Sequence, residues 1–359
     1  MKRSSSLSHK RESIRRFERD GETLAENGCW YKVGGWTIAR LSSEGVFVSI
    51  LEKSSLARVF CGAVLFCATA NHVVRAQQAQ TSSQEQPATD ESAAAPAPDK
   101  SGYSLLDPTP DSQLRSFAPD RPPKADSAYT VDAGHFQYET DLLNYSNTNF
   151  GGVTTKLYQA FDLVWKVGLT NWVDFELQFN GYQNLVATSN ATGAVVAKGF
   201  GFGDVLLKSK INLFGNDGGS AALAVIPYVK IPSGTLNISN GVVEGGLIAP
   251  LQLKLPQDFG LTMMTEVDVL KNANDSGRHP NFINLINLNH PVPGIKNLSA
   301  SIEFYSSVGT DVNTRPIYTL DTALIYLVTD NVQLDCGVDF GLNKAAPNLQ
   351  VFTGLSQRF

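Results

Sequence analysis

Strict alternation of apolar and polar residues along residues 156–180 predicts a β-hairpin. One face is apolar and rich in aromatic residues: Leu157, Phe161, Leu163, Trp165, Val167, Val173, Phe175, Leu177 and Phe179. The other face is polar or charged: Lys156, Tyr158, Asp162, Lys166, Asp174, Glu176, Gln178 and Asn180. Residues Gly168–Asn171 supply the turn. Because successive side chains of a strand point to opposite faces, we expect a ribbon with one apolar and one ionic side.

A half-buried strand of a soluble sandwich would also alternate. Here the apolar face is aromatic and the polar face carries full charges. The strands also run for about ten residues, which is the length of a transmembrane β-strand. These features together favour a barrel that faces lipid on the outside and water on the inside.

The same alternation continues from Gly134 to Phe359 and predicts about twelve strands, an even number, as single-chain bacterial barrels have. They are His135–Tyr145, Thr155–Val167, Trp172–Tyr182, Asp204–Leu213, Ala221–Ile231, Val243–Leu255, Leu261–Leu270, Phe282–His290, Leu298–Val308, Ile317–Val328, Val332–Phe340 and Leu349–Phe359. The fold class is therefore all-β, a transmembrane antiparallel β-barrel.

Short and long connections alternate between these strands. The short ones hold the Gly, Asn, Asp and Pro residues that tight turns need: Gly168–Asn171, Gly215–Gly219, Pro256–Gly260, Pro291–Lys296 and Thr329–Asn331. The expected longer loops are Ser146–Val153, Gln183–Gly203, Pro232–Gly241, Lys271–Pro280, Gly309–Pro316 and Leu342–Pro347. Short periplasmic turns and longer outer loops are the usual asymmetry of such barrels.

Residues 53–76 have the plan of a secretory signal peptide. Lys53 and Arg58 precede the apolar run Val59–Ala70, and Val74-Arg75-Ala76 ends in a small residue. The run is too short to cross a bilayer, which takes about 20 apolar residues. We predict cleavage after Ala76, which N-terminal sequencing of the mature protein tests.

The segments on either side of this signal differ in kind. Residues 1–52 are either the product of a mis-assigned start codon, with the true start near Val46, Val48 or Leu51, or an extended leader. Residues 77–127 are rich in Gln, Ala, Pro, Ser and Asp, and bury too little apolar surface to offset the entropy of ordering. We expect them to be a low-complexity periplasmic tether or a loosely bound plug, and the barrel to comprise residues 128–359.

Composition and motifs argue against several classes of ligand. The chain is 42% hydrophobic, 18% charged and carries a net charge of -5, and without a basic patch it is a poor ligand for nucleic acid. No spacing of metal ligands is present in the sequence. The run Gly199–Asp204 looks like a nucleotide loop, but an alternating strand follows it instead of a helix, so the phosphate interpretation fails. We expect neither metal nor cofactor.

Charged residues on the predicted inner face are the candidate pore lining. The basic ones lie on the second to sixth strands: Lys156, Lys166, Lys208, Lys210, Lys230 and Lys254. The acidic ones lie on the seventh to eleventh strands: Glu266, Asp268, Glu303, Asp321, Asp335 and Asp339. Rings of fixed charge set the selectivity of pores. The alternative is that these charges pair across neighbouring strands and fill a narrow barrel.

One enzymatic alternative is a barrel that hydrolyses phospholipids with a Ser–His pair on its lipid face. His290 could approach Ser299 across the Pro291–Lys296 turn. The pair would sit at the periplasmic rim without an obvious third member, so we expect no catalytic residue.

Short motifs from Asp120 onward resemble those of a known family. They are Asp120-Arg121-Pro122, the run from Tyr129 to Glu139, Gly201-Phe202-Gly203-Asp204, Ile231-Pro232-Ser233-Gly234 and Glu244-Gly245-Gly246-Leu247. Over about Pro119–Phe359 the chain resembles the family named for the meta-pathway of phenol degradation, also called outer-membrane transporter-like proteins. The resemblance implies an outer-membrane β-barrel that passes small compounds, aromatic ones among them. The long N-terminal piece departs from the family.

We therefore expect a passive channel or transporter for small solutes in the bacterial outer membrane. Its partners would be the solute, outer-membrane lipid and the outer-membrane insertion machinery, since Phe359 resembles the terminal aromatic residue that this machinery reads. One alternative is a structural or surface-interaction barrel without transport. Another is a transporter of hydrophobic compounds with a lateral opening at a strand kink near Pro227 or Pro250, because proline interrupts ladder hydrogen bonds.

Overall fold

The computed structural model describes residues 30–33, 36–39, 99–274 and 276–359. The chain divides into two compact units, Met1–Ser92 and Ala93–Phe359. In the first unit, β1 (Trp30–Val33) pairs antiparallel with β2 (Trp36–Ala39). The predicted signal peptide, residues 53–76, and residues 77–98 of the predicted tether lie outside the described residues.

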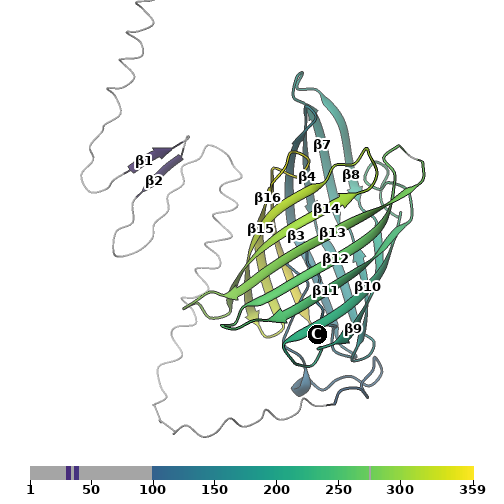
Figure 1. Ribbon diagram of the computed structural model, residues 1–359, viewed down its shortest axis with the longest axis vertical. Helices are drawn as coiled ribbons and strands as arrows, with labels where there is room; N and C mark the ends of the chain where they lie inside the picture. The colour runs from purple at the N-terminus through teal and green to yellow at the C-terminus, as the bar shows by residue number, and fades with distance from the viewer. Residues whose placement is uncertain (1–29, 34–35, 40–98, 275) are drawn as a thin grey trace, which may run out of the picture. The chain divides into compact units, whose positions relative to one another are not determined.

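The second unit is a closed antiparallel β-barrel with tilted strands (Figure 1). Its strands are β3 (Phe136–Phe150), β4 (Val153–Ala160), β5 (Asp162–Gly168), β6 (Val173–Phe179), β7 (Tyr182–Ser189), β8 (Val195–Phe202), β9 (Val205–Phe214), β10 (Ala221–Ile231), β11 (Glu244–Lys254), β12 (Gly260–Lys271), β13 (Arg278–Pro291), β14 (Leu298–Gly309), β15 (Ile317–Thr329), β16 (Val332–Gly341) and β17 (Leu349–Arg358). β17 pairs with β3 and closes the wall. The pairs β4/β5, β6/β7 and β8/β9 are each one broken strand, so the described wall has twelve strands, as predicted.

The three breaks lie beside one another and reverse the inside–outside alternation. Phe161, between β4 and β5, has a left-handed φ of 59°. The neighbouring strand breaks at Asn180–Gly181 and the next at Gly203–Asp204, and the Asn180 N–H donates to the Asp204 carbonyl at 3.1 Å. Each break acts like a bulge, which adds a residue and turns the following side chains to the other face. The expectation that Lys156 and Tyr158 share a face with Asp162 and Lys166 is therefore wrong.

The barrel has polar side chains on its inner face and apolar side chains on its outer face, the reverse of a soluble protein. On β16 the apolar residues point outward, as predicted, while Gln333, Asp335 and Asp339 are buried inside. Large aromatic side chains such as Trp165, 58% exposed, lie on the outer surface. A closed sheet satisfies its own backbone hydrogen bonds, which a lipid environment requires. The outer surface is therefore the membrane-facing one.

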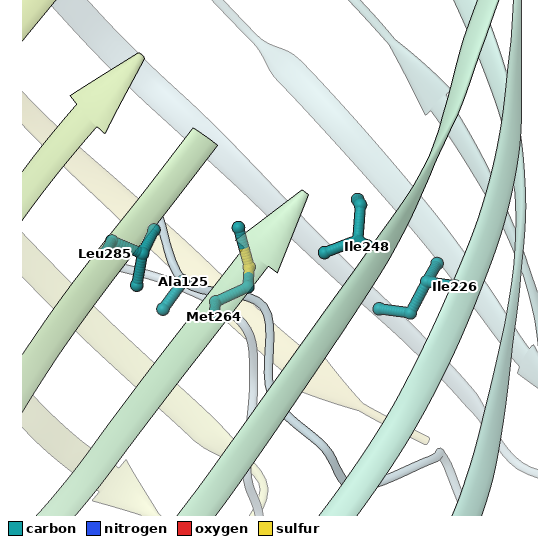
Figure 2. Close-up of a cluster of buried hydrophobic side chains, with 5 residues drawn as sticks. All are labelled: Ala125, Ile226, Ile248, Met264 and Leu285. Carbon is teal, nitrogen blue, oxygen red and sulfur yellow. The ribbon is translucent and has the colours of Figure 1, made fainter. Parts of the chain in front are cut away.

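A small apolar cluster lies inside the lumen. Ala125 packs against Ile226, Ile248, Met264 and Leu285, which project inward from β10 to β13 (Figure 2). Ala125 precedes the barrel strands in the sequence, so the segment just before β3 must pass through the interior of the barrel. This cluster and the ion pairs described below hold that segment in place.

The connections match the prediction at one end of the barrel and depart from it at the other. The short turns are 169–172, 215–220, 255–259, 292–297 and 330–331, within two residues of the predicted ones. We call this the short-turn end. The expected long loops Ser146–Val153 and Gln183–Gly203 are wrong, because both are mostly strand, and the β7–β8 hairpin projects beyond the wall (Figure 1). The longest connection at this end is 232–243.

The wall is continuous past the two strand prolines. Pro227 of β10 pairs with Leu247 of β11, and Pro250 of β11 pairs with Met264 of β12, without a register shift in either ladder. A lateral opening at Pro227 or Pro250 is therefore not present. Among the described residues no helix is long and apolar enough to span a membrane.

Candidate functional site in the barrel lumen

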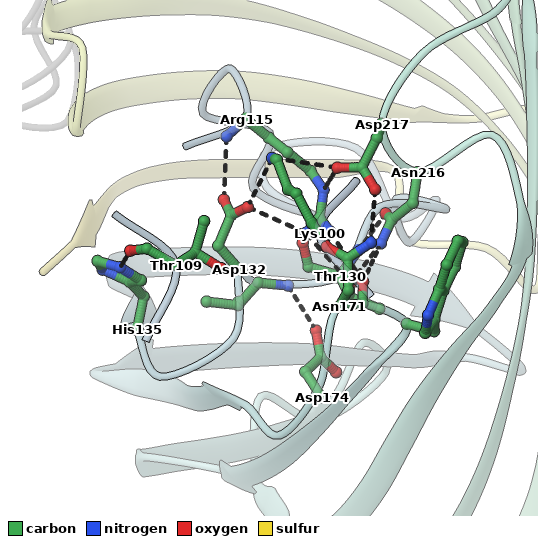
Figure 3. Close-up of polar contacts among 12 residues, drawn as sticks. Lys100, Thr109, Arg115, Thr130, Asp132, His135, Asn171, Asp174, Asn216 and Asp217 are labelled. Atoms are coloured by element: carbon green, nitrogen blue, oxygen red, sulfur yellow. Dashed lines mark hydrogen bonds and ion pairs between the residues drawn. The ribbon is translucent and has the colours of Figure 1, made fainter. Parts of the chain in front are cut away.

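Residues 115–132, which we call the plug segment, enter the lumen from the short-turn end and return to it. Arg115 and Thr130, near the two ends of the segment, both bind Asn171 in a short turn (Figure 3). Between them, Arg121 reaches Asp335 on β16 and Lys124 reaches Asp321 on β15. The segment is thus a loop whose base lies at the short turns and whose tip, residues 120–126, lies among the wall charges.

The base is held by a buried network of charges (Figure 3). Asp132 is 1% exposed and binds Lys100 Nζ at 3.2 Å, the Arg115 N–H at 3.1 Å and Arg358 Nη1 at 3.4 Å. Arg115 Nε also donates to Asp217 in the turn 215–220 at 2.9 Å. Burial alone would raise the pKa of the Asp217 carboxyl, but hydrogen bonds from Asn171 and Arg115 lower it below its usual range.

The first anchor of the tip is Asp120 on the basic side of the lumen. Its carboxylate bridges Lys166 of β5 and Lys210 of β9, with Lys210 Nζ at 2.8 Å and a short contact to Lys166. Both lysine side chains are almost fully buried. Burial alone would raise the pKa of Asp120, but the two ammonium groups lower it well below its usual range. Asp120 is therefore ionised at neutral pH and shares the two lysines with the wall carboxylates Glu139 and Glu176.

The second anchor is a pair of plug cations on the acidic side. Arg121 donates to Asp335 Oδ1 at 2.7 Å and also contacts Asp141 of β3. Lys124 Nζ lies 2.5 Å from Asp321 and 2.7 Å from Asp339. Burial alone would lower the pKa of both cations, but the surrounding carboxylates raise it. The plug tip thus carries a negative charge to the basic wall and positive charges to the acidic wall.

Two cavities border the plug segment, one at its tip and one at its base. A cavity of about 420 Å³, which we call the acidic cavity, is lined by residues 121–124 of the tip and by inward side chains of the wall, Glu303 and Asp339 among them. A cavity of about 620 Å³ at the base is lined by Phe117, His135 and Arg358 among others. The two share no lining residue. The tip and the base of the plug segment therefore border different cavities.

The strand registers place eleven of the twelve candidate residues on the inner face of the barrel: Lys166, Lys208, Lys210, Lys230, Lys254, Glu266, Asp268, Glu303, Asp321, Asp335 and Asp339. Lys230 binds Asp204 and Glu244 on neighbouring strands, at 3.2 and 2.7 Å. Lys156 is the exception: it is exposed and lies opposite Asn147, beside the outward pair Tyr145–Tyr158. The left-handed residue Phe161 causes this, since it reverses the faces of β4 relative to β5.

Sequence reasoning missed the residues that complete the site. Asp120, Arg121 and Lys124 belong to a low-complexity stretch that we expected to be a tether or a loosely bound plug. A usable signal was present: the run Asp120-Arg121-Pro122-Pro123-Lys124 places opposite charges beside two prolines. Proline limits the conformations of the unfolded chain, which lowers the entropy that ordering costs.

The structure does not bring together the Ser–His pair that the hydrolase alternative requires. His290 of β13 lies opposite Ala300, whereas Ser299 lies opposite Pro291, so the two side chains point to opposite faces of the wall. His290 Nε2 lies instead 3.0 Å from the carbonyl oxygen of Gln257, and its ring packs on Phe259. Among the residues that the structure describes, no group of three or more His, Cys, Asp or Glu side chains could hold a metal ion.

The closed wall, apolar exterior and charged interior define a β-barrel of the bacterial outer membrane. Residues 119–359 match the model of the family described as "Putative MetA-pathway of phenol degradation". The chain belongs to this family, as its sequence motifs predicted.

Solved structures of other outer-membrane barrels are similar to the chain. The COG4313 outer membrane channel from Pseudomonas putida F1 is 14% identical, with a TM-score of 0.49 over 66% of this chain and 100% of that one. The NanC porin is 10% identical, with a TM-score of 0.39 over 62% and 98% of the two chains. The translocator domain of the autotransporter NalP from Neisseria meningitidis is 15% identical, with a TM-score of 0.39 over 63% and 88%. No curated protein matches the chain.

Proposed function

We propose that the protein is a passive outer-membrane channel for small solutes, closed by its own plug segment. The observation that carries this proposal is the chemistry of the lumen. Its wall is polar and charged apart from the small apolar cluster around Ala125, and the tip of the plug is held mainly by ion pairs from Asp120, Arg121 and Lys124. A barrel whose only purpose was rigidity could fill its interior with apolar side chains. Ion pairs instead allow the plug to leave without exposing a large apolar surface.

The inward charges named above would line the path once the plug moves. Basic residues of β5, β9 and β10 would face acidic residues of β14 to β16 across the lumen, and such fixed charges control which ions and solutes pass. The name of the family links it to phenol degradation, so aromatic compounds are the first solutes to test. Liposome swelling with phenols, sugars and amino acids measures this preference directly.

Planar-bilayer recordings of the full chain and of Arg121→Gln test the channel. Loss of the guanidinium leaves Asp141 and Asp335 without their plug cation, so the variant should conduct for a larger fraction of the time than the wild type. Arg315→Gln is the matched control, since Arg315 is exposed in the connection 310–316. If neither protein conducts at any voltage, the structural or surface-interaction barrel is the better account.

We further infer that residues 53–76 direct export and are removed after Ala76, and that residues 77–98 link the new N-terminus to the plug. The aromatic end of the chain supports recognition by the outer-membrane insertion machinery. Phe359 is 61% exposed, lies 5.9 Å from the ring of Tyr138 and pairs through its backbone with Phe136. Its side chain is thus accessible while its backbone completes the ladder.

A further inference from the structure

We propose that the acidic cavity is a binding site for small organic cations that carry one or two ammonium groups, and that Arg121 and Lys124 of the plug occupy part of it as internal ligands. The inference names a substrate class for the proposed channel, and rests on the proposed function only where it concerns transport. Binding itself can be measured without any conductance.

The charge of the cavity wall is the first observation. Nine charged residues line the cavity, and the seven acidic ones all come from the barrel: Glu139, Asp141, Asp162, Glu266, Glu303, Asp321 and Asp339. The two basic ones, Arg121 and Lys124, both come from the plug. Among the described residues, the barrel contributes no Lys, Arg or His to this lining. The wall is therefore built to receive cations, and the plug supplies two of them.

Each plug cation sits between carboxylates and an aromatic ring. Lys124 Nζ lies 5.1 Å from the ring centroid of Tyr305, and Asp321 and Asp339 bind it on other sides. Arg121 Cζ lies 5.8 Å from the ring centroid of Phe352, with Asp141 and Asp335 as its ion-pair partners. An aromatic face beside carboxylates is the arrangement that recognises organic ammonium groups. A hydrated metal ion would gain little from the rings.

Buried acceptors without partners are an independent sign of a ligand. The side-chain oxygen of Asn144 and Oδ1 of Asp321 are buried, accept no hydrogen bond from the described residues, and belong to residues that line the cavity. Asn144 is 8% exposed and the Asp321 side chain 9%. Buried polar atoms are nearly always hydrogen-bonded, so each such exception needs a donor. An ammonium group carries three N–H donors and could supply one to such an acceptor.

The size of the cavity sets the size of the ligand. About 420 Å³ lies within the range of small-molecule sites and already excludes the volume of Arg121 and Lys124. A monoamine with an aromatic ring, or a short diamine, fits this space. Suitable probes are benzylamine and 1,4-diaminobutane, with benzyl alcohol and succinate as uncharged and anionic counterparts.

Lys124→Gln separates an internal ligand from a structural strut. If Lys124 competes with added amines, its removal should tighten benzylamine binding about tenfold or more, which is about 1.4 kcal/mol, because Asp321 and Asp339 then become available to the amine. In this background, Asp321→Asn should weaken binding about tenfold again. Asp258→Asn, in the exposed turn 255–259, should leave the affinity unchanged.

Calorimetry of the detergent-solubilised full chain measures these affinities, with circular dichroism as the check on folding. Arg121→Gln replaces Lys124→Gln if the latter fails to fold. The proposal is overturned if amines show no saturable binding, if succinate or benzyl alcohol binds equally well, or if Lys124→Gln fails to tighten amine binding. If plug variants conduct more but bind no amine, the channel function stands and the amine site is refuted. If amines bind but no variant conducts, the amine site stands and the channel function is refuted.

Discussion

Asp120→Asn tests whether ion pairs hold the plug in the lumen. The substitution keeps the size of the side chain and removes the charge that Lys166 and Lys210 share. Removing one partner of a buried ion pair costs about 3–5 kcal/mol, because the other charge is left uncompensated. Glu139 still lies 2.5 Å from Lys166, and Glu176 still lies 3.3 Å from Lys210.

These remaining carboxylates place the loss near the lower end of the range, at about 3 kcal/mol. Since about 1.4 kcal/mol corresponds to a factor of ten, the population with an undocked plug should rise about a hundredfold. Single-channel recording measures it as the fraction of time spent in a conducting state. The wall does not depend on Asp120, so the barrel should still fold.

Asp111→Asn is the matched control for this experiment. Asp111 lies in η1 (Asp111–Gln113) on the same approach to the barrel, but its side chain is exposed. The control should record like the wild type. An Asp120→Asn barrel that folds normally and conducts no more than the control would refute the electrostatic account of the plug.

Three further predictions concern pH, packing and assembly. Loss of water around Asp126 raises the pKa of its carboxyl to about 6, so the docked plug binds a proton more tightly than the undocked one. Conductance should therefore fall as pH drops from 7 to 5, and Asp126→Asn should reduce that dependence. A Cβ atom at Gly168 would collide with the backbone oxygen of Asp132, so Gly168→Ala should lower the urea midpoint of unfolding, while Gly102→Ala, with open space around it, should not. Phe359→Ala should reduce the amount of protein in the outer membrane of cells while barrels folded in detergent keep their urea midpoint.

The regular part of the barrel could be predicted from the sequence because lipid imposes a simple rule on every residue. From β10 to β17 no strand is broken in two, and the predicted boundaries lie within four residues of those observed. On β16 the sequence alone separates Leu334, which faces lipid, from Asp335, which faces the lumen. Where one face of a strand must be apolar, the register is determined by the pattern.

The predictions that fail concern residues where the alternation of lipid-facing and lumen-facing side chains is broken or weak. Phe161 adopts a left-handed conformation that its side chain does not favour, and it lies in a row of breaks that continues through the next two strands, β6/β7 and β8/β9. No local signal in the sequence reveals that reversal, so Lys156 was assigned to the wrong face. The stretch Gln183–Gly203 contains many small residues and was expected to be a loop, yet β7 and β8 pair with each other along it.

The plug could not be predicted for a different reason, which also explains how it works. Its residues are polar and would not fold alone, since they bury little apolar surface. They are ordered here because the wall presents buried charges, such as Asp335, for which the plug supplies the partner, and a buried ion pair is stronger than one in bulk solvent. Removal of the plug lets water into the lumen, and that water solvates the same wall charges. The energy that orders the plug and the energy that stabilises an open, hydrated channel therefore come from one set of side chains, so a modest change in charge at Asp120, Arg121 or Lys124 should shift the balance between the two states.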